Sequence, residues 1–467
     1  MITSPTIVSR RHFLRMSAVG LATTVAAVGL AACGGTSASV ATVATTPAST
    51  ASKAVPVANA PSTAPASLAF VTWGDVKETN LREKQVAQFT KDHPSIKVMY
   101  TATPQNYWDV LQTRMAGGDA PDVYYLEPAH TLDLQCRGAL LNLSPYVSRD
   151  HFDLSDFYPA GPLEYTVDGK LWALNRDFAN QDIFYNVDMF QKAGVALPPK
   201  KFDAAGWTFD DFLTTCQKLT SGSGPTKAFG FAVPQGFRAY MAFIWSNGGD
   251  IVTDDAKKPA IDQPNAVEGL QFLEDLIGKY KVSPAPADLQ SQNANDLFYT
   301  GRIGMIVSIP ANIAQIRTGA KNFHWDVTPP PMGPHGTKRQ VGGGGAGYGV
   351  YGKTKSPDAA WALMTYMTSA DVQKQEVDAG TSMGSRFSVG DYFVQSNQGK
   401  DPSNVDMFVD ASKKYLHTDP LASGWLQIQN ILAKELAGIW DGGTPAKDVA
   451  ASIARQMAPL LLERCGQ

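Results

Sequence analysis

Apolar positions along this chain form short runs and helical stripes that alternate from about residue 68 onward. Residues 68–73 and 122–126 are each continuous enough to predict a buried strand. Between them a helix is predicted, because one helical face carries Trp108, Leu111 and Met115. Such alternation of strand and helix predicts an α/β protein with parallel sheets and helices on both faces.

Capping signals place the starts of further helices. The pairs Thr208 with Asp211 and Asn265 with Glu268 have capping-box spacing. After the second pair, one helical face carries Val267, Leu270, Ile277 and Tyr280. Ser356 followed by Pro357 predicts the start of another helix.

The N-terminal pattern is that of an export signal. A small-residue apolar run at 16–32 is too short and too rich in Ala and Gly to predict a membrane span. It directly follows Arg10 and Arg11, as in a twin-arginine signal. A disordered basic tail would explain the arginines but not the apolar run, so residues 1–32 are predicted to be a signal peptide.

The predicted cleavage site has the pattern of a bacterial lipobox, Leu30-Ala31-Ala32-Cys33. Residues 33–66 are mostly Ala, Ser, Thr, Pro and Val, a composition that cannot bury enough surface to order itself. We therefore expect lipidation at Cys33, a flexible tether over 33–66, and an extracytoplasmic protein anchored to the outer face of the cytoplasmic membrane.

Charge and cysteine content narrow the function classes. Loss of the three arginines in 1–32 moves the formal net charge from -3 to about -6, which argues against a nucleic-acid partner. Cys136, Cys216 and Cys465 allow at most one disulfide and lack metal-site spacing. We expect no cofactor and no metal, and a body large enough for two lobes.

Several short motifs occur in a fixed order through most of the body. They are, in chain order, Ala-Gly-Gly-Asp-Ala-Pro-Asp-Val at 116–123, Asp-Gly-Lys-Leu-Trp at 168–172, Phe-Tyr-Asn at 184–186, Lys-Ala-Gly at 192–194, Ser-Asn-Gly-Gly-Asp at 246–250, Phe-Tyr-Thr-Gly-Arg-Ile-Gly-Met at 298–305 and the glycine-rich 341–349. In this order the motifs resemble those of the family 1 extracellular solute-binding proteins of sugar ABC importers.

This resemblance implies a two-lobed, type II-like periplasmic-binding-protein fold with a ligand cleft between lobes joined by crossing strands. Lobe 1 would comprise 67–177 with 345–382, and lobe 2 would comprise 178–344 with 383–467. The glycines at 342–345 suit a hinge because they have the freest backbone, although a surface loop is the commoner place for such a run. The family pattern implies the other crossings near 176–180 and 380–386.

Sugar capture requires aromatic platforms and polar side chains at strand ends that face the cleft. Trp73, Asp75 and Glu127 are candidate ligand-binding residues because they follow the first predicted strands. Asn175, Arg176 and Asp177 are candidates because they lie where the chain leaves the first lobe. The resemblance adds a further set: Tyr107, Trp245, Asn247, Ser308, Gly344 and Arg386. We predict that Trp245 stacks on the ligand and that Glu127 accepts its hydroxyl hydrogens, although tryptophans are often core residues and Arg386 could form a surface ion pair.

Three motifs typical of enzymes or nucleotide-binding proteins lack their structural context. Residues 347–354 match Walker A spacing, but the residues between the glycines are predicted to be extended. The glycines at 342–347 match a dinucleotide motif with no helix behind them. Ser382 fits a nucleophile elbow only by spacing, since no strand precedes it, and we predict a loop serine.

The function expected from the resemblance is capture of a carbohydrate for the permease subunits of an ABC importer, by a monomer that is not an enzyme. A glycerol phosphodiester is an alternative ligand, for which Arg386 would supply a counter-charge. A secreted glycan-active enzyme and a surface adhesin remain alternatives. Tyr124 and Tyr125 cannot both bind one iron ion, because adjacent residues of a strand point to opposite faces of the sheet.

Overall fold

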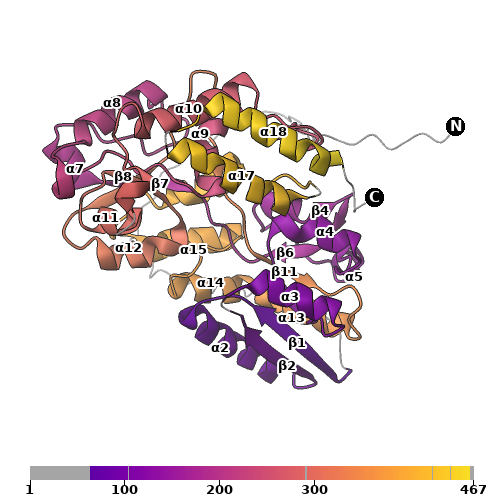
Figure 1. The fold of residues 1–467 in the computed structure, drawn as a ribbon. Helices are drawn as coiled ribbons and strands as arrows, with labels where there is room; N and C mark the ends of the chain where they lie inside the picture. The colour runs from indigo at the N-terminus through magenta and orange to yellow at the C-terminus, as the bar shows by residue number, and fades with distance from the viewer. Residues whose placement is uncertain (1–63, 104, 290–291, 423, 442, 463–467) are drawn as a thin grey trace, which may run out of the picture. The chain divides into compact units, whose positions relative to one another are not determined.

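The computed structural model of the protein describes residues 64–462, apart from 104, 290–291, 423 and 442 (Figure 1). The predicted signal peptide, Cys33, nearly all of the predicted tether and Cys465 lie outside the described residues. Within the described part, no helix is long and apolar enough to cross a membrane. Cys216 is free and buried, and Cys136 is disulfide-bonded.

The first sheet has five strands in the order β2-β1-β3-β11-β6. Their bounds are Ile96–Ala102, Ala66–Thr72, Val123–Leu126, Gly347–Val350 and Ala173–Asn175. The predicted strands at 68–73 and 122–126 are thus confirmed within a residue or two at each end. β1, β2 and β3 are parallel, whereas β11 runs antiparallel to both of its neighbours, so the prediction of a parallel sheet is only partly right.

Four helices pack with this sheet around one core, and Figure 1 shows three of them, α2, α3 and α13, beside it. They are α2 (Val76–Asp92), α3 (Tyr107–Ala116), α13 (Pro357–Met367) and α14 (Ala370–Asp378). The predicted helix at Trp108 is confirmed, and Gly117 is its C-cap residue. The start predicted at Ser356 is also confirmed, with Pro357 in the first helical position.

The second sheet has three strands in the order β8-β7-β9, with bounds Met305–Ser308, Asp182–Asn186 and Trp325–Thr328. β7 is antiparallel to both neighbours, so the predicted parallel pairing is wrong here. The reason is that a long excursion through helices separates β7 from β8, and only tertiary packing sets the direction in which the chain returns.

Helices cover this second sheet and form the largest core of the described residues. The chief ones are α7 (Val187–Lys192), α8 (Phe209–Leu219), α9 (Phe237–Ser246), α10 (Pro264–Ile277), α17 (Trp425–Trp440) and α18 (Ala446–Leu462). The yellow pair α17 and α18 lie side by side in Figure 1. The capping box from Thr208 is confirmed, but the one from Asn265 is wrong: Pro264 already occupies the first helical position, and Glu268 accepts a hydrogen bond from Asn247 instead.

Shorter elements complete the fold. The helices are α4 (Thr131–Cys136), α5 (Ser144–Arg149), α6 (Ala160–Glu164), α11 (Ala294–Tyr299), α12 (Ile313–Gly319), α15 (Phe387–Asn397) and α16 (Asp406–Asp410). The strands are β4 (Thr166–Val167), β5 (Lys170–Leu171), β10 (Val341–Gly342) and β12 (Leu416–His417). A third core cluster, containing Phe184, Trp325 and Phe408, lies against the second sheet.

The glycine run at 342–345 is buried and passes between β10 and β11. None of these four glycines has a positive φ, so backbone freedom is not what selects glycine in this conformation. Close approach selects it: a Cβ on Gly345 would lie 1.9 Å from the carbonyl oxygen of Asp177, and one on Gly342 would lie 2.2 Å from that of Arg238. The surface-loop alternative is therefore wrong, and the hinge role stays a prediction.

The residues that match the Walker A and nucleophile-elbow spacings form the extended segment and the loop that the sequence predicts. Residues 347–350 form the extended strand β11, and the next helix begins only at Pro357. A P-loop instead has a compact turn between its glycines and a helix directly after its lysine. Ser382 lies in the loop after α14, where its hydroxyl accepts a hydrogen bond from the amide of Gly384 at 2.8 Å.

Candidate ligand-binding site

Polar side chains gather at one edge of the first sheet. Glu127 directly follows β3, and Asp177 follows β6 by two residues. The antiparallel strand β11 starts at this same edge, because Gly347 pairs with both Leu126 and Asn175. The Asp177 carboxylate accepts the amide hydrogen of Ala346 at 2.9 Å and so fixes the chain as it enters β11.

A buried tyrosine holds this edge together. The hydroxyl of Tyr165 lies 2.8 Å from the carbonyl oxygen of Leu126 and 3.1 Å from that of Gly345, so it bridges the end of β3 and the glycine run. Beside it, Glu164 ends α6 and lies 3.5 Å from the amide of Gly345. Asn175 is also fully buried here, against Gly161.

Two residues from distant segments complete the group. Arg238, in the first turn of α9, binds Asp419 in bidentate fashion, with N···O distances of 3.0 Å and 2.7 Å. The guanidinium packs on the backbone of Gly344, where a Cβ would lie 2.7 Å from its central carbon. We call Glu127, Glu164, Asp177, Arg238 and Asp419 the junction cluster.

The pKa values of two carboxyl groups in the junction cluster are raised. Burial raises the pKa of Glu127; Arg238 opposes this shift, while Asp419 and Asp177 add to it by repulsion. Burial, with repulsion from Asp419, raises the pKa of Glu164 to about 8. Glu164 is therefore mostly protonated at neutral pH, and it contributes a neutral carboxylic acid to the cluster.

Glu164 should make the protein less stable as pH rises. The folded state holds the Glu164 proton up to about pH 8, whereas the unfolded chain releases it near the ordinary glutamate pKa of about 4.3. Between these values the folded state binds more protons, so the free energy of unfolding falls with increasing pH. Glu164→Gln, which cannot ionise, should show a shallower fall between pH 5 and pH 8 in urea denaturation.

The exposed Glu83 of α2 supplies the control, since Glu83→Gln should follow the parent's pH profile. If Glu164→Gln loses stability as steeply as the parent over this interval, the proton is not held at Glu164.

An aromatic group lies beside the cluster at the ends of β1 and β3. Trp73 contacts Tyr125 and Tyr107 with ring centroids 4.5 Å and 5.0 Å away, and Trp108 stacks on His130 at 3.5 Å. Tyr107 is buried, and its hydroxyl donates to the carbonyl of Tyr125 at 2.9 Å. Trp73 and Trp108 are only half-buried, so ring surface remains for a ligand. Burial lowers the pKa of His130 to about 4, and its ring is neutral at physiological pH.

Arg176 connects Asp177 of the junction cluster to a buried charge network. Its guanidinium contacts the carboxylate of Asp177 and the hydroxyl of Tyr125, and lies 3.5 Å from a carboxylate oxygen of Glu376. Arg82 binds the other carboxylate oxygen of Glu376 at 2.6 Å. Tyr124, on the opposite face of the strand from Tyr125, donates to the carbonyl of Ala139, so the two tyrosines do not share a partner.

Four predicted site residues have side chains that bind other parts of the protein. Asp75 caps α2, where its carboxylate accepts the Glu78 amide at 2.8 Å. The side-chain N–H groups of Asn247 donate to the carbonyl oxygen of Asn265 and to the carboxylate of Glu268, and its side-chain oxygen accepts from the backbone amide of His335. Ser308 accepts from Asn312 at 3.1 Å, and Arg386 donates to Thr368 and pairs with Asp156.

Trp245 is 3% exposed, and its ring stacks on His417 at 4.1 Å while its N–H donates to Asp250. One ring face is thus covered by protein, and stacking of Trp245 on a ligand stays a prediction.

Sequence reasoning missed Trp108, Glu164, Tyr165, Arg238 and Asp419 as members of this region. The sequence could have indicated Trp108 as a site residue, because it directly follows Tyr107, which was predicted to bind the ligand. The other four had none, since only folding brings α6, α9 and the segment before α17 to the edge of the first sheet.

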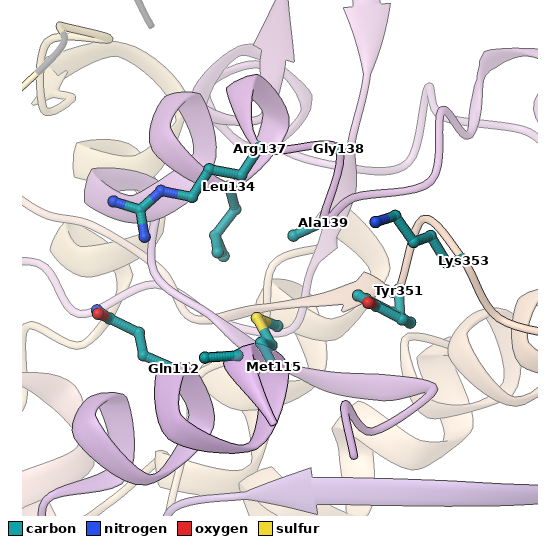
Figure 2. Close-up of a pocket in the computed structure, with 9 residues that line it drawn as sticks. Gln112, Met115, Leu134, Arg137, Gly138, Ala139, Tyr351 and Lys353 are labelled. Atoms are coloured by element: carbon teal, nitrogen blue, oxygen red, sulfur yellow. The ribbon is translucent and has the colours of Figure 1, made fainter. Parts of the chain in front are cut away.

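A separate pocket of about 270 Å³ lies between α3, α4 and the segment after β11 (Figure 2). Figure 2 shows Arg137, Gln112 and Lys353 around it, with Met115 and Leu134 supplying apolar surface. It includes none of the predicted site residues. Within the junction cluster, Glu164 and Asp419 are buried, whereas Glu127, Asp177 and Arg238 are only partly buried.

Comparisons with known proteins agree with this arrangement of elements. The family model for bacterial extracellular solute-binding proteins matches residues 75–374. A putative binding protein of Brucella abortus is 24% identical over 393 residues, covering 78% of this chain and 86% of that protein. The maltotriose-binding protein of Pyrococcus abyssi is 24% identical over 303 residues, covering 64% of this chain and 62% of its own length.

Among solved structures, an ABC substrate-binding protein from Listeria monocytogenes in complex with cycloalternan superposes with a TM-score of 0.74. The identity is 24%, and the match covers 84% of this chain and 98% of that one. The fold is therefore the predicted two-lobed α/β fold of the periplasmic binding proteins.

Proposed function

Because this chain belongs to the bacterial extracellular solute-binding proteins, we propose that it captures a carbohydrate outside the cytoplasmic membrane for an ABC importer. The permease subunits of that importer would be its membrane partners, and the protein would act as a monomeric binder rather than as an enzyme. The names of the relatives support a sugar, since one binds maltotriose and a structural neighbour holds cycloalternan.

The observation that carries the proposal is the half-buried pair Trp73 and Trp108, with ring centroids 6.2 Å apart, together with the partly buried Glu127 directly after β3. Sugars present weakly apolar C–H faces and hydroxyl edges, which aromatic rings and carboxylates bind respectively. Glu127 is only partly buried, and a ligand hydroxyl would donate a hydrogen bond to its carboxylate.

Binding would involve separation and closure of two lobes. The proposed lobes are 67–177 with 345–382 and 178–344 with 383–467, and the proposed hinge includes 342–345. Opening would expose the junction cluster, and closure on a ligand would bury it again, because contacts from both sides favour the closed state.

A thermal-shift screen of the full chain against neutral and basic oligosaccharides, monosaccharides and glycerol phosphodiesters tests the ligand class. A ligand at about 100 times its Kd should add roughly 2.7 kcal/mol to the stability of the native state and raise Tm by several degrees. We expect at least one sugar to do so and to be recovered unchanged after long incubation.

Three results would contradict the proposal. A shift with phosphodiesters alone would select the alternative ligand, for which Arg386 has no free role in this structure because it is paired with Asp156. Turnover of a sugar would favour the enzyme. If no small molecule shifts Tm, the adhesin alternative gains support.

We further propose that a lipid on Cys33 anchors the protein. Two acyl chains on the diacylglyceryl group supply stable attachment, whereas a single chain would be marginal. Cys33→Ser should therefore move most of the protein from the membrane fraction to the soluble extracytoplasmic fraction. An unchanged membrane fraction for Cys33→Ser, compared with the parent and with Ser37→Ala as a neighbouring control, would exclude the anchor.

A further inference from the structure

A disulfide at the end of α4 joins Cys136 to a cysteine outside the described residues. The chain has four cysteines, at positions 33, 136, 216 and 465. Cys136 is disulfide-bonded, whereas Cys216 is free and buried in the core that covers the second sheet. The partner of Cys136 is therefore Cys33 or Cys465.

The chemistry proposed for Cys33 removes it from this choice. A lipid anchor uses the sulfur of Cys33 in a thioether to diacylglycerol. Disulfides form through a thiolate, and a sulfur that already carries a thioether has no thiol to ionise. A lipidated Cys33 cannot pair with Cys136, and Cys465 is the cysteine that remains.

Contacts of the C-terminal helix give an independent reason for the same choice. The backbone of Gly424 hydrogen-bonds to the carboxylate of Asp133 in α4. The same glycine packs on α18, because a Cβ on it would lie 3.2 Å from the Cβ of Leu460. Asp133 is one helical turn before Cys136, so the last turn of α18 lies close to the segment that carries this cysteine.

The chain after Leu460 is long enough to reach Cys136. Cys465 follows Leu460 by five residues, which span up to about 17 Å when extended. A disulfide requires its two Cα atoms to lie within roughly 4.4–6.8 Å of each other. The extended reach therefore exceeds the separation that the bond itself demands.

Core packing connects the same segments of the chain. The turn Pro128–His130 leads into α4, and its residue Ala129 belongs to one buried cluster with Trp425 of α17 and Leu461 of α18. α17 also contacts this turn directly. The C-terminal helix pair thus packs on the segment that leads to Cys136.

We propose that Cys136 and Cys465 form a disulfide that ties the end of α18 to α4. Cys136 belongs to proposed lobe 1 and Cys465 to proposed lobe 2, so the bond crosses from one lobe to the other. It limits how far the lobes separate beside α4 and leaves the proposed hinge at 342–345 unbonded. The pairing stands apart from ligand capture, whereas its effect on the lobes rests on the proposed function.

Formation of this bond is an oxidation of two thiols. Each thiol loses one proton, and the pair loses two electrons as the S–S bond forms. A protein disulfide of an extracytoplasmic thiol oxidoreductase accepts these electrons by exchange and is left as a dithiol. Cys136 is only partly buried, so an exchange partner can reach it. An oxidising compartment outside the cytoplasm then preserves the bond.

Peptide mapping without reduction tests the pairing. Trypsin releases residues 115–137 and residues 465–467 as separate fragments, because cleavage follows Arg114, Arg137 and Arg464. In protein isolated from the cell envelope with free thiols blocked, we expect these two fragments to stay joined. Reduction should separate them and lower the mass of the joined species by that of the tripeptide.

Two mapping results would overturn the pairing. The first is a blocked free thiol at Cys136 in the isolated protein. The second is a fragment 115–137 that is joined to a peptide containing Cys33 or Cys216.

Small-angle scattering tests the effect on the lobes. The Cys33→Ser form of the full chain, which carries no lipid, serves as the parent for this measurement. Without ligand, adding Cys465→Ser should increase the radius of gyration, because the lobes separate further. Cys136→Ser and the variant that lacks both cysteines should give the same increase, since removal of either partner breaks one shared bond.

The controls separate loss of the bond from other effects. Gln467→Ala changes the same tripeptide but keeps Cys465, so it should keep the parent's radius. Reduction should enlarge the parent but leave Cys465→Ser unchanged. An unchanged radius in Cys465→Ser would overturn the limit on lobe separation, while the peptide map decides the pairing and the thermal-shift screen decides carbohydrate capture.

Discussion

Glu376→Ala should lower the free energy of unfolding by about 3–5 kcal/mol, the usual cost of removing one member of a buried ion pair. Glu376 lies 2.6 Å from Arg82 and 3.5 Å from Arg176, and all three side chains are almost fully buried. Its loss would leave two buried guanidinium groups with less compensating charge. Urea denaturation followed by circular dichroism measures the effect.

Gln375 provides the matched control, because it is the preceding residue of α14 and is exposed. Gln375→Ala should change the free energy of unfolding by less than about 0.5 kcal/mol. Glu376→Gln should fall between the two, since it keeps the shape and removes the charge. A loss below about 1 kcal/mol for Glu376→Ala would mean that water or Asp177 compensates the arginines.

Trp73→Ala should weaken binding of the sugar with the largest thermal shift by roughly 30-fold or more, which corresponds to about 2–4 kcal/mol for an aromatic anchor. Trp73 is half-buried at the end of β1, and its ring is oriented by Tyr125 and Tyr107. Trp73→Phe should retain part of the affinity because it keeps an aromatic face. Calorimetry gives the change in Kd.

Trp172→Ala controls for general damage to the same core. Trp172 is also half-buried and packs against the core of the first sheet, but its N–H donates to the carbonyl of Val167. A folded Trp73→Ala variant with parental affinity, or an equal loss of affinity in Trp172→Ala, would show that Trp73 is not a ligand platform.

Local signals in the sequence predicted several elements well. The strands at 68–73 and 122–126, the capping box at Thr208 and the helix start at Ser356 were all confirmed, because each depends on neighbouring residues alone. The capping box at Asn265 failed for an equally local reason, since Pro264 starts the helix earlier.

The glycine run at 342–345 was only partly predictable from the sequence. Its composition indicated a special backbone segment, but not why glycine is required. The structure supplies close approach as the reason, with Asp177 and Arg238 packed where side chains would otherwise be.

The sequence by itself determined the α/β class, the resemblance to extracellular solute-binding proteins, and strand ends such as Glu127 and Asp177, because periodicity, caps and motif order are encoded locally. Tertiary structure alone decided the antiparallel directions of β7 and β11, and it alone brought Arg238 and Asp419 beside Glu127 and Glu164. It also turned Arg176 toward Glu376 and Trp245 toward His417. The physical reason is that strand direction and side-chain partners depend on contacts between segments far apart in the chain, and burial and charge pairing arise only once those contacts exist.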